Sequence, residues 1–279
     1  MTQAKVSPTA ANPAEVYEQF FIPAIFRHWT PMLLEFAQPK PGEHILDLAS
    51  CTGIVSRFLS HIFDSNGGKP GRVVALDINP AMLEVARSKS NSQAPYIEWQ
   101  EGNAESLLFP DGSFDLVLCQ AGLMLFKDRA AAAREMHRVL KPGGRAVVLV
   151  WQSLKQNPFA KAFNESLSRR LGVDIAVVSP SYSLGSPAEL SVLLSAAGFR
   201  SVEVYPVQYH TFVDDPASYM ELAFKGAAAA VPFYAGLDDK TRSELAKDVT
   251  RDVEPIMKQY IHNGRMIHPQ AANIAVAYA

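Results

Sequence analysis

Short apolar runs alternate with amphipathic segments between residues 44 and 151, and this alternation predicts a mixed α/β fold. Five runs have the length and composition of buried strands, namely 44–48, 72–77, 96–100, 114–120 and 145–151. Between them, segments 54–63, 78–89 and 129–140 place apolar residues on one helical face. Strands that alternate with helices predict a doubly wound, mostly parallel sheet covered on both faces.

The flanking segments add helices and two further strands to this pattern. Residues 15–37 carry large apolar side chains interrupted by Pro23 and Pro31, which predicts two short helices. Ser186 and Gly198 bracket another helix, and residues 199–206 have the pattern of a strand. Residues 214–264 are expected to be mainly helical, and residues 271–279 to form the last strand. The sheet is therefore expected to have seven strands.

Composition excludes several classes of protein. The chain has 279 residues, a formal net charge of −2 and 48% hydrophobic residues, which indicates a globular protein and argues against nucleic acid as a partner. Cys51 and Cys119 both lie in apolar surroundings, so neither a disulfide scaffold nor a metal site is expected. We find neither a signal-peptide pattern nor an apolar run of the roughly 18 residues that a membrane span needs, so we expect a cytoplasmic location.

Residues 44–58, HILDLASCTGIVSRF, predict a strand, a tight turn and the start of a helix. Open α/β sheets bind nucleotides at such turns, because backbone N–H groups and the helix dipole converge there. The dinucleotide fingerprint G-x-G-x-x-G is absent. Instead, Asp47, Ala49, Cys51 and Gly53 stand at alternate positions. This pattern disfavours a dehydrogenase that uses NAD or FAD.

The segment ILDLASCTG resembles the first motif of class I S-adenosylmethionine (SAM) dependent methyltransferases. Segments 101–126 and 134–151 resemble later motifs of the ubiquinone/menaquinone-biosynthesis-like, or type 11, group. The resemblance covers about residues 41–151. It implies a Rossmann-like methyltransferase fold, SAM as the cofactor, S-adenosylhomocysteine as the product, and no metal.

The resemblance also implies roles for individual residues. The methionine end of SAM is expected to lie against the first turn. Asp77 is expected to bind the ribose hydroxyls, and Gln120 to face the sulfonium side. The turn residues are Asp47, Ala49, Ser50, Cys51 and Gly53, and the residues expected near the adenine are Ile78, Met82, Asn103 and Ala104.

Two of these positions depart from the family pattern. Cys51 stands where many relatives have glycine, and a positive φ there would cost on the order of 1 kcal/mol. Its thiol either packs under the cofactor or acts as a nucleophile with a lowered pKa. Asn103 stands where relatives commonly have aspartate, and its carbonyl can still accept from the adenine amino group.

Methyl transfer from a sulfonium is an in-line displacement that depends mainly on alignment of donor and acceptor. No catalytic residue is evident, and His28 is the one candidate base. Aromatic and sulfur side chains are expected to wall a substrate pocket; they are Tyr17, Phe21, Trp29, Met124 and Trp151. Such a pocket favours a small hydrophobic metabolite as the substrate. One acceptor group that we consider is a thiol or hydroxyl of a secondary metabolite. The acceptor atom and the oligomeric state stay open.

The expected organisation has four segments: N-terminal lid helices at 1–40, a SAM-binding core at 41–213, a helical insertion at 214–264, and a final strand at 265–279. A second functional class competes with the methyltransferase. It is a protein of the same fold that binds SAM without methyl transfer, either as a cyclase-like enzyme or as a regulatory module.

Overall fold

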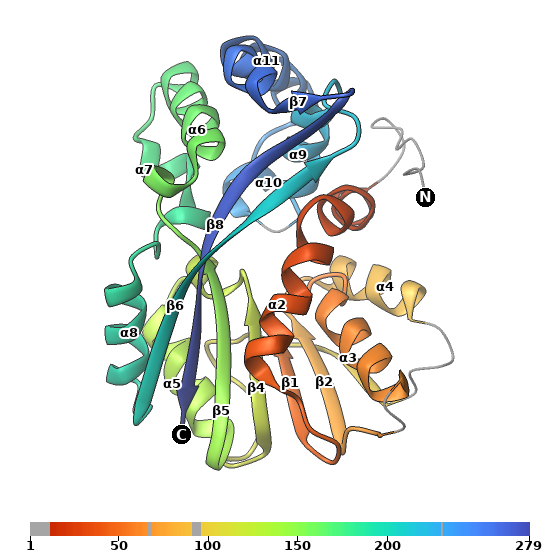
Figure 1. Ribbon diagram of the computed structural model, residues 1–279, viewed down its shortest axis with the longest axis vertical. Coiled ribbons are helices and arrows are strands. Elements are labelled where there is room, and N and C mark those ends of the chain that lie inside the picture. The colour runs from red at the N-terminus through yellow and green to blue at the C-terminus, as the bar shows by residue number, and fades with distance from the viewer. Residues whose placement is uncertain (1–11, 66–67, 91–95, 230) are drawn as a thin grey trace. The chain divides into compact units, whose positions relative to one another are not determined.

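The computed structural model describes residues 12–65, 68–90, 96–229 and 231–279 (Figure 1). These residues divide into two compact units. Unit 1 takes in the described residues of Met1–His28, Ser153–Ser183 and Gln208–Ala271, and unit 2 those of Trp29–Gln152, Leu184–Val207 and Ala272–Ala279. The four segments expected from the sequence do not coincide with these units, and they stay a prediction.

The sheet of unit 2 has the predicted doubly wound, mostly parallel arrangement. Its strands are β1 His44–Leu48, β2 Arg72–Asp77, β3 Ile97–Glu101, β4 Phe114–Gln120 and β5 Leu140–Trp151, with the adjoining parts of β6 Ser201–Val213 and β8 Arg265–Tyr278. Among the described residues the strand order is β3-β2-β1-β4-β5-β8-β6, and the two-residue strand β7, Ile261–His262, pairs with β8 off this path. The first five strands pair in parallel, whereas β8 is antiparallel to β5.

The helices of this unit begin where the sequence places cap residues. Figure 1 shows α3 and α4 beside β1 and β2, and α5 and α8 toward the opposite edge of the sheet. Their bounds are α3 Ile54–Ser65, α4 Pro80–Lys89, α5 Arg129–Val139 and α8 Pro187–Ala196, with the short 3₁₀ turn η2 at Leu123–Leu125. The side chain of Ser186 accepts a backbone N–H group of α8, which confirms its predicted place at the start of that helix, and Asn79 caps α4 in the same way.

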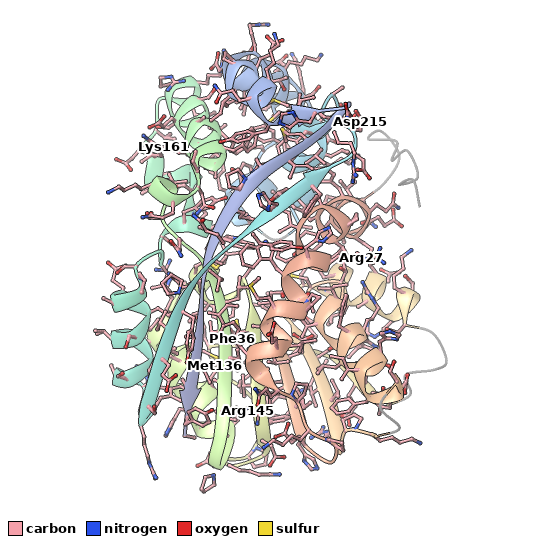
Figure 2. The ribbon with its side chains drawn as sticks, in the orientation of Figure 1. Arg27, Phe36, Met136, Arg145, Lys161 and Asp215 are labelled. Atoms are coloured by element: carbon pink, nitrogen blue, oxygen red, sulfur yellow. The ribbon has the colours of Figure 1, made fainter. Side chains whose placement is uncertain are left out.

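Helix α2, Arg27–Ala37, is tied to the sheet by one arginine. Arg145 of β5 donates from Nε to the Ala37 carbonyl at 2.7 Å and from a terminal nitrogen to Glu43 at 2.8 Å. Phe36, on the same helix, packs its ring 4.9 Å from that of Tyr205 on β6. Figure 2 labels Phe36 and Arg145. These contacts anchor the C-terminal end of α2 to the strands that follow it in unit 2.

Unit 1 is mainly helical. Its helices are α1 Pro13–Val16, the π-helix η1 Tyr17–Phe26, α6 Pro158–Leu171, α7 Ile175–Val178, α9 Tyr219–Ala227, α10 Pro232–Ala235 and α11 Asp239–Tyr260, with the 3₁₀ turns η3 Leu154–Gln156 and η4 Pro180–Tyr182. The long helix α11 packs against both α6 and α9. Arg170 of α6 bridges Asp248 and Asp252 of α11 at 2.9 and 2.7 Å.

Two local predictions were wrong. The N-terminal segment does not break at its prolines: the helical run extends from Pro13 to Ala37, with π-helical geometry over Tyr17–Phe26. The wider π-helical turn accommodates Pro23, which has no N–H to contribute to the hydrogen-bond ladder. Strands β6 and β8 are also longer than expected, because the strand conformation continues through residues 207–213 and 265–270, where buried residues alternate with more exposed ones near the ends.

Candidate functional site

The turn between β1 and α3 repeats a left-handed backbone at alternate residues. The φ angles are +55° at Ala49, +50° at Cys51 and +82° at Gly53. Only the last of these is a glycine, so two L-residues carry the strain of a conformation that costs on the order of 1 kcal/mol each. The sequence raised a positive φ at Cys51 as a condition, and the structure has it.

Asp47, the acidic residue of the turn motif, is buried beneath the start of α3. One of its carboxylate oxygens accepts hydrogen bonds from Ser56 Oγ at 2.7 Å and from the Ser56 backbone N–H at 3.1 Å. Burial raises the pKa of Asp47 to about 7, against the opposing effect of the Ser56 hydrogen bonds. Asp47 therefore caps α3 from outside the helix and fixes the turn's direction.

Asp77, at the end of β2, connects the turn after β1 to β2 through hydrogen bonds. Its Oδ2 accepts the Cys51 backbone N–H at 2.8 Å, and its Oδ1 accepts the Asn79 backbone N–H at 2.9 Å. The Cys51 thiol adds a hydrogen bond to this carboxylate. Burial raises the Asp77 pKa, and these hydrogen bonds oppose the rise. The two roles considered for Cys51, packing under the cofactor and nucleophilic attack, stay predictions.

The residues expected near the adenine differ in how accessible they are. Ile78 exposes 67% of its surface directly after Asp77, whereas Met82 is 1% exposed and belongs to the core under α4. Asn103 is exposed, and its Oδ1 accepts the Glu105 backbone N–H at 2.9 Å. Ala104 is buried. Ile78 is therefore the one of these four that offers a broad apolar face to a ligand.

Gln120 ends β4 next to the first turn. Its Nε2 donates to Thr30 Oγ1 at 3.0 Å, and its buried Oε1 has no hydrogen-bond partner among the described residues. The hydroxyl groups of Ser50 and Thr52 are also buried and have no hydrogen-bond partner among the described residues. Buried polar atoms are costly without partners, so these three groups are candidates for hydrogen bonds to a bound ligand.

The turns after β1 and β4 approach each other closely. A Cβ added at Gly122 would lie 2.7 Å from Ala49 Cβ and 3.1 Å from Cys119 Sγ. Ala121 before it has a φ of +56°. The strand order runs outward from β1 in one direction and from β4 in the other, which makes this the topological switch point where open α/β sheets bind ligands.

The arrangement fits SAM chemically. Asp77 keeps lone pairs for ribose hydroxyls, and Ile78 presents an exposed apolar side chain. The unpartnered polar atoms of Ser50, Thr52 and Gln120 can pair with the polar methionine end. The individual binding roles of these residues stay predictions.

The residues expected to wall a substrate pocket are divided between the two units. In unit 2, the rings of Trp29 and Trp151 meet edge to face with centroids 5.3 Å apart. Met124, which follows β4 in the sequence, is buried. In unit 1, the rings of Tyr17 and Phe21 are 5.4 Å apart. His28, the candidate base, also lies in unit 1, with its ring 4.4 Å from that of Phe212 and a pKa lowered by burial. Their roles toward a substrate stay predictions.

Several residues that shape the site were missed from the sequence. Ser56 holds Asp47, Thr30 holds Gln120, and Trp99 of β3 packs where a Cβ at Gly53 would overlap its ring. No local signal marks these partners, because each lies on a different element from the residue that it contacts. Cys119 is fully buried, as expected of a core residue.

Two features are absent from the described part of the chain. None of its helices has the length and apolar character that a membrane crossing requires. Within the same residues, no cluster of three or more His, Cys, Asp or Glu side chains could hold a metal ion.

Comparison with known proteins identifies the class. A family model described as a methyltransferase domain matches residues 46–148, which span β1 to β5. The fold agrees: the YcgJ protein of Bacillus subtilis aligns with 90% of this chain and 98% of its own, with a TM-score of 0.62 and 19% identity. The [4+2]-cyclase SpnF aligns with 90% of this chain and 80% of its own, with a TM-score of 0.55 and 18% identity. The protein is a SAM-dependent methyltransferase.

Sequence relatives narrow the family. The ubiquinone/menaquinone biosynthesis C-methyltransferase UbiE of Salmonella arizonae is 31% identical over 215 residues, which are 72% of this chain and 84% of the relative. The chain belongs to the class I SAM-dependent methyltransferases of the UbiE-like type, as the resemblance in its motifs implied.

Proposed function

We propose that unit 2 binds SAM at the carboxyl ends of β1, β2 and β4. Asp77 holds the ribose hydroxyls, Ile78 covers the adenine, and the turn from Asp47 to Gly53 meets the methionine end. The observation that supports this most directly is the set of buried, unpartnered polar atoms on Ser50, Thr52 and Gln120 at the switch point. Gln120 Oε1 is the group assigned to the sulfonium side, where a carbonyl oxygen favours positive charge.

The reaction we propose is methyl transfer to a small hydrophobic acceptor by in-line displacement. When bound, SAM supplies the methyl group on a good leaving group, so the protein's task is alignment and exclusion of water. Asp47 and Ser56 fix the turn, Asp77 locks it to β2, and Thr30 orients Gln120. None of these side chains is assigned a proton-transfer step.

For the acceptor we propose a hydroxyl or a thiol on a small metabolite. The name of the UbiE relatives refers to ubiquinone and menaquinone biosynthesis and to a C-methyltransferase. A hydroxylated aromatic acceptor is compatible with that name, whereas the expected place in secondary metabolism stays a prediction. We propose a cytoplasmic location on the same grounds as in the sequence analysis.

The competing function, SAM binding without methyl transfer, draws on the likeness to a cyclase. That likeness is one of fold alone, whereas the family match concerns methyltransferases. Methyl transfer is therefore the favoured function.

The test is release of S-adenosylhomocysteine from SAM in the presence of a panel of phenols and thiols. We expect acceptor-dependent release by the wild-type protein and a loss of catalytic efficiency of about 5- to 150-fold at subsaturating SAM in Asp77→Ala, because a hydrogen-bonded carboxylate contributes roughly 1–3 kcal/mol.

Glu101→Gln is the matched control. Glu101 pairs with Asp77 in the strand register and is exposed at the same edge of the sheet, yet it is not assigned to the cofactor. Equal losses of catalytic efficiency in the two variants would mean that Asp77 acts only through its negative charge and not through hydrogen bonds to the ribose. SAM binding without product release for any acceptor would favour the competing function.

A further inference from the structure

A tryptophan on the terminal strand of the sheet packs against the turn proposed to bind SAM. Among the described residues, β3 lies at one end of the strand order and pairs with β2 alone, where Trp99 is in register with Ala75. The Trp99 side chain is half-buried. A Cβ built on Gly53 would lie 2.6 Å from Trp99 Cζ3 and closer still to its Cη2. The outer edge of the indole therefore occupies the space that a side chain at Gly53 would take.

Small residues from three elements leave room for this ring. Ala75 on β2 and Ala86 on α4 are both fully buried, and Ala86 Cβ lies 3.4 Å from the position of a Cβ at Gly53. The backbone of β3 is also tied to α4, since a terminal nitrogen of Arg87 donates to the Trp99 carbonyl at 3.2 Å. Removal of the indole would leave a cavity between β3 and the turn.

Gly53 is the residue at which the turn after β1 becomes helix α3. Its N–H donates to the Ser50 carbonyl at 2.8 Å, and its own carbonyl accepts the Arg57 backbone N–H at 3.0 Å. Its φ of +82° is accessible to glycine, but glycine also has the widest choice of other conformations. The contact with Trp99 restricts that choice. It thereby also restricts the positions of the unpartnered hydroxyl groups of Ser50 and Thr52.

We propose that Trp99 is a positioning residue for the cofactor: its indole, packed on Gly53, holds the turn in the conformation that receives the amino-acid end of SAM. This inference rests on the proposed function and adds to it a residue of β3, outside the motif-bearing turn, that sets the affinity for the cofactor. Without the indole, binding has to order the turn as well, which weakens the affinity. The ribose end depends on it less, because Asp77 belongs to β2 and is also fixed by the Asn79 backbone N–H at 2.9 Å.

The experiment uses the full chain and two ligands that differ at the amino-acid end. S-adenosylhomocysteine carries this end, whereas 5′-methylthioadenosine keeps the adenine and the ribose but lacks the amino and carboxylate groups. Calorimetric titration with each ligand gives two dissociation constants for every variant. In Trp99→Ala we expect S-adenosylhomocysteine to bind about 5- to 20-fold more weakly, and 5′-methylthioadenosine to keep its wild-type affinity within about 2-fold.

Two further variants separate positioning from structural support. Ile97→Ala is the matched control, because Ile97 lies two residues earlier on β3 and is 8% exposed, so its truncation also removes buried packing from this strand. It is expected to lower the unfolding free energy and to leave both affinities within about 2-fold of wild type. Trp99→Phe is expected to restore only part of the affinity for S-adenosylhomocysteine, since a phenyl ring lacks the outer edge that reaches Gly53. Should Trp99→Ala not fold, Trp99→Phe compared with Ile97→Ala decides the matter.

Three outcomes overturn the inference. One is an unchanged affinity of Trp99→Ala for S-adenosylhomocysteine, and another is an equal loss for both ligands, which would mean that the indole supports the fold of the whole site. The third is an equal loss of affinity for S-adenosylhomocysteine in Ile97→Ala. A folded wild-type protein that binds neither ligand contradicts the proposed function itself. Wild-type protein that binds S-adenosylhomocysteine with an affinity independent of Trp99 contradicts only the role of this residue.

Discussion

Two residues in the first turn, Ala49 and Cys51, adopt a backbone conformation that glycine would adopt more easily. Their φ angles are nearly equal, at +55° and +50°. They differ in that Cys51 also donates a thiol hydrogen bond to Asp77, the residue proposed to hold the ribose. Cys51 therefore adds backbone strain to the turn and also stabilises it through the hydrogen bond to Asp77. The hydrogen bond explains how a non-glycine residue is tolerated at this position.

Substitution to glycine separates the two effects. We predict that Ala49→Gly raises the unfolding free energy by about 0.5–1 kcal/mol, because it relieves left-handed strain without loss of a polar contact. Cys51→Gly should gain less, since it also removes the thiol hydrogen bond. Urea denaturation of both variants measures the difference. A larger gain in Cys51→Gly than in Ala49→Gly would show that the thiol contact does not stabilise the turn.

Asp47 introduces a pH dependence of its own. Its folded-state pKa of about 7 lies above the ordinary value of 3.8, so the folded state binds more protons than the unfolded state between these limits. The stability that this group contributes is fully present below the unfolded pKa and is lost as the pH rises through 7. Asp47→Asn removes the titration and keeps an acceptor for Ser56.

We therefore predict that the unfolding free energy of Asp47→Asn, relative to wild type, rises by roughly 2–3 kcal/mol between pH 5 and pH 8. Urea denaturation at the two pH values measures this change. Asp115→Asn serves as the control: burial raises the pKa of Asp115, but hydrogen bonds from Lys141 and the His44 backbone lower it overall. Its difference from wild type should stay nearly constant over this range. A constant difference for Asp47→Asn as well would contradict an uncharged Asp47 in the folded state at low pH.

At the scale of elements, the packing of β3 against the first turn depends on the absence of a side chain at Gly53. A Cβ there would overlap the Trp99 ring, and the φ of +82° adds backbone strain. Gly143, within β5, has a similar φ of +79°, but no atom lies within 4 Å of the position that a Cβ would take there. Substitution by alanine therefore carries a similar backbone strain at both glycines, but a steric overlap only at Gly53.

We predict that Gly53→Ala lowers the unfolding free energy by about 1–3 kcal/mol more than Gly143→Ala does, which is the usual range for overpacking. Thermal or urea unfolding of the two variants provides the comparison. Equal losses would mean that Trp99 moves aside without cost and that close packing of β3 on the turn is not required.

The same elements show how far sequence patterns reach. Strands 44–48, 72–77 and 114–120 were predicted to the residue, because buried parallel strands are continuous apolar runs, and Asn79 and Ser186 mark helix starts through local hydrogen bonds. The uninterrupted helical run through Pro23 could not be predicted, since a π-helical turn leaves no signature in composition. Contacts such as Ser56 with Asp47 and Thr30 with Gln120 depend on tertiary packing.

At the scale of the whole molecule, the two units carry different chemistry. Unit 2 holds the motif-bearing turn, Asp77 and the switch point of the sheet, and it contains the region matched by the methyltransferase family. Unit 1 holds an aromatic cluster in which the rings of Phe159, Tyr219 and Tyr260 pack around that of His268.

The central claim is that this chain binds SAM at the first turn despite Cys51. Calorimetric titration of the purified protein with SAM and with S-adenosylhomocysteine tests it most directly. We predict micromolar binding of both ligands with one site per chain, and affinities weakened about 5- to 150-fold in Asp77→Ala, as expected for loss of roughly 1–3 kcal/mol. A folded wild-type protein that binds neither ligand would contradict the account.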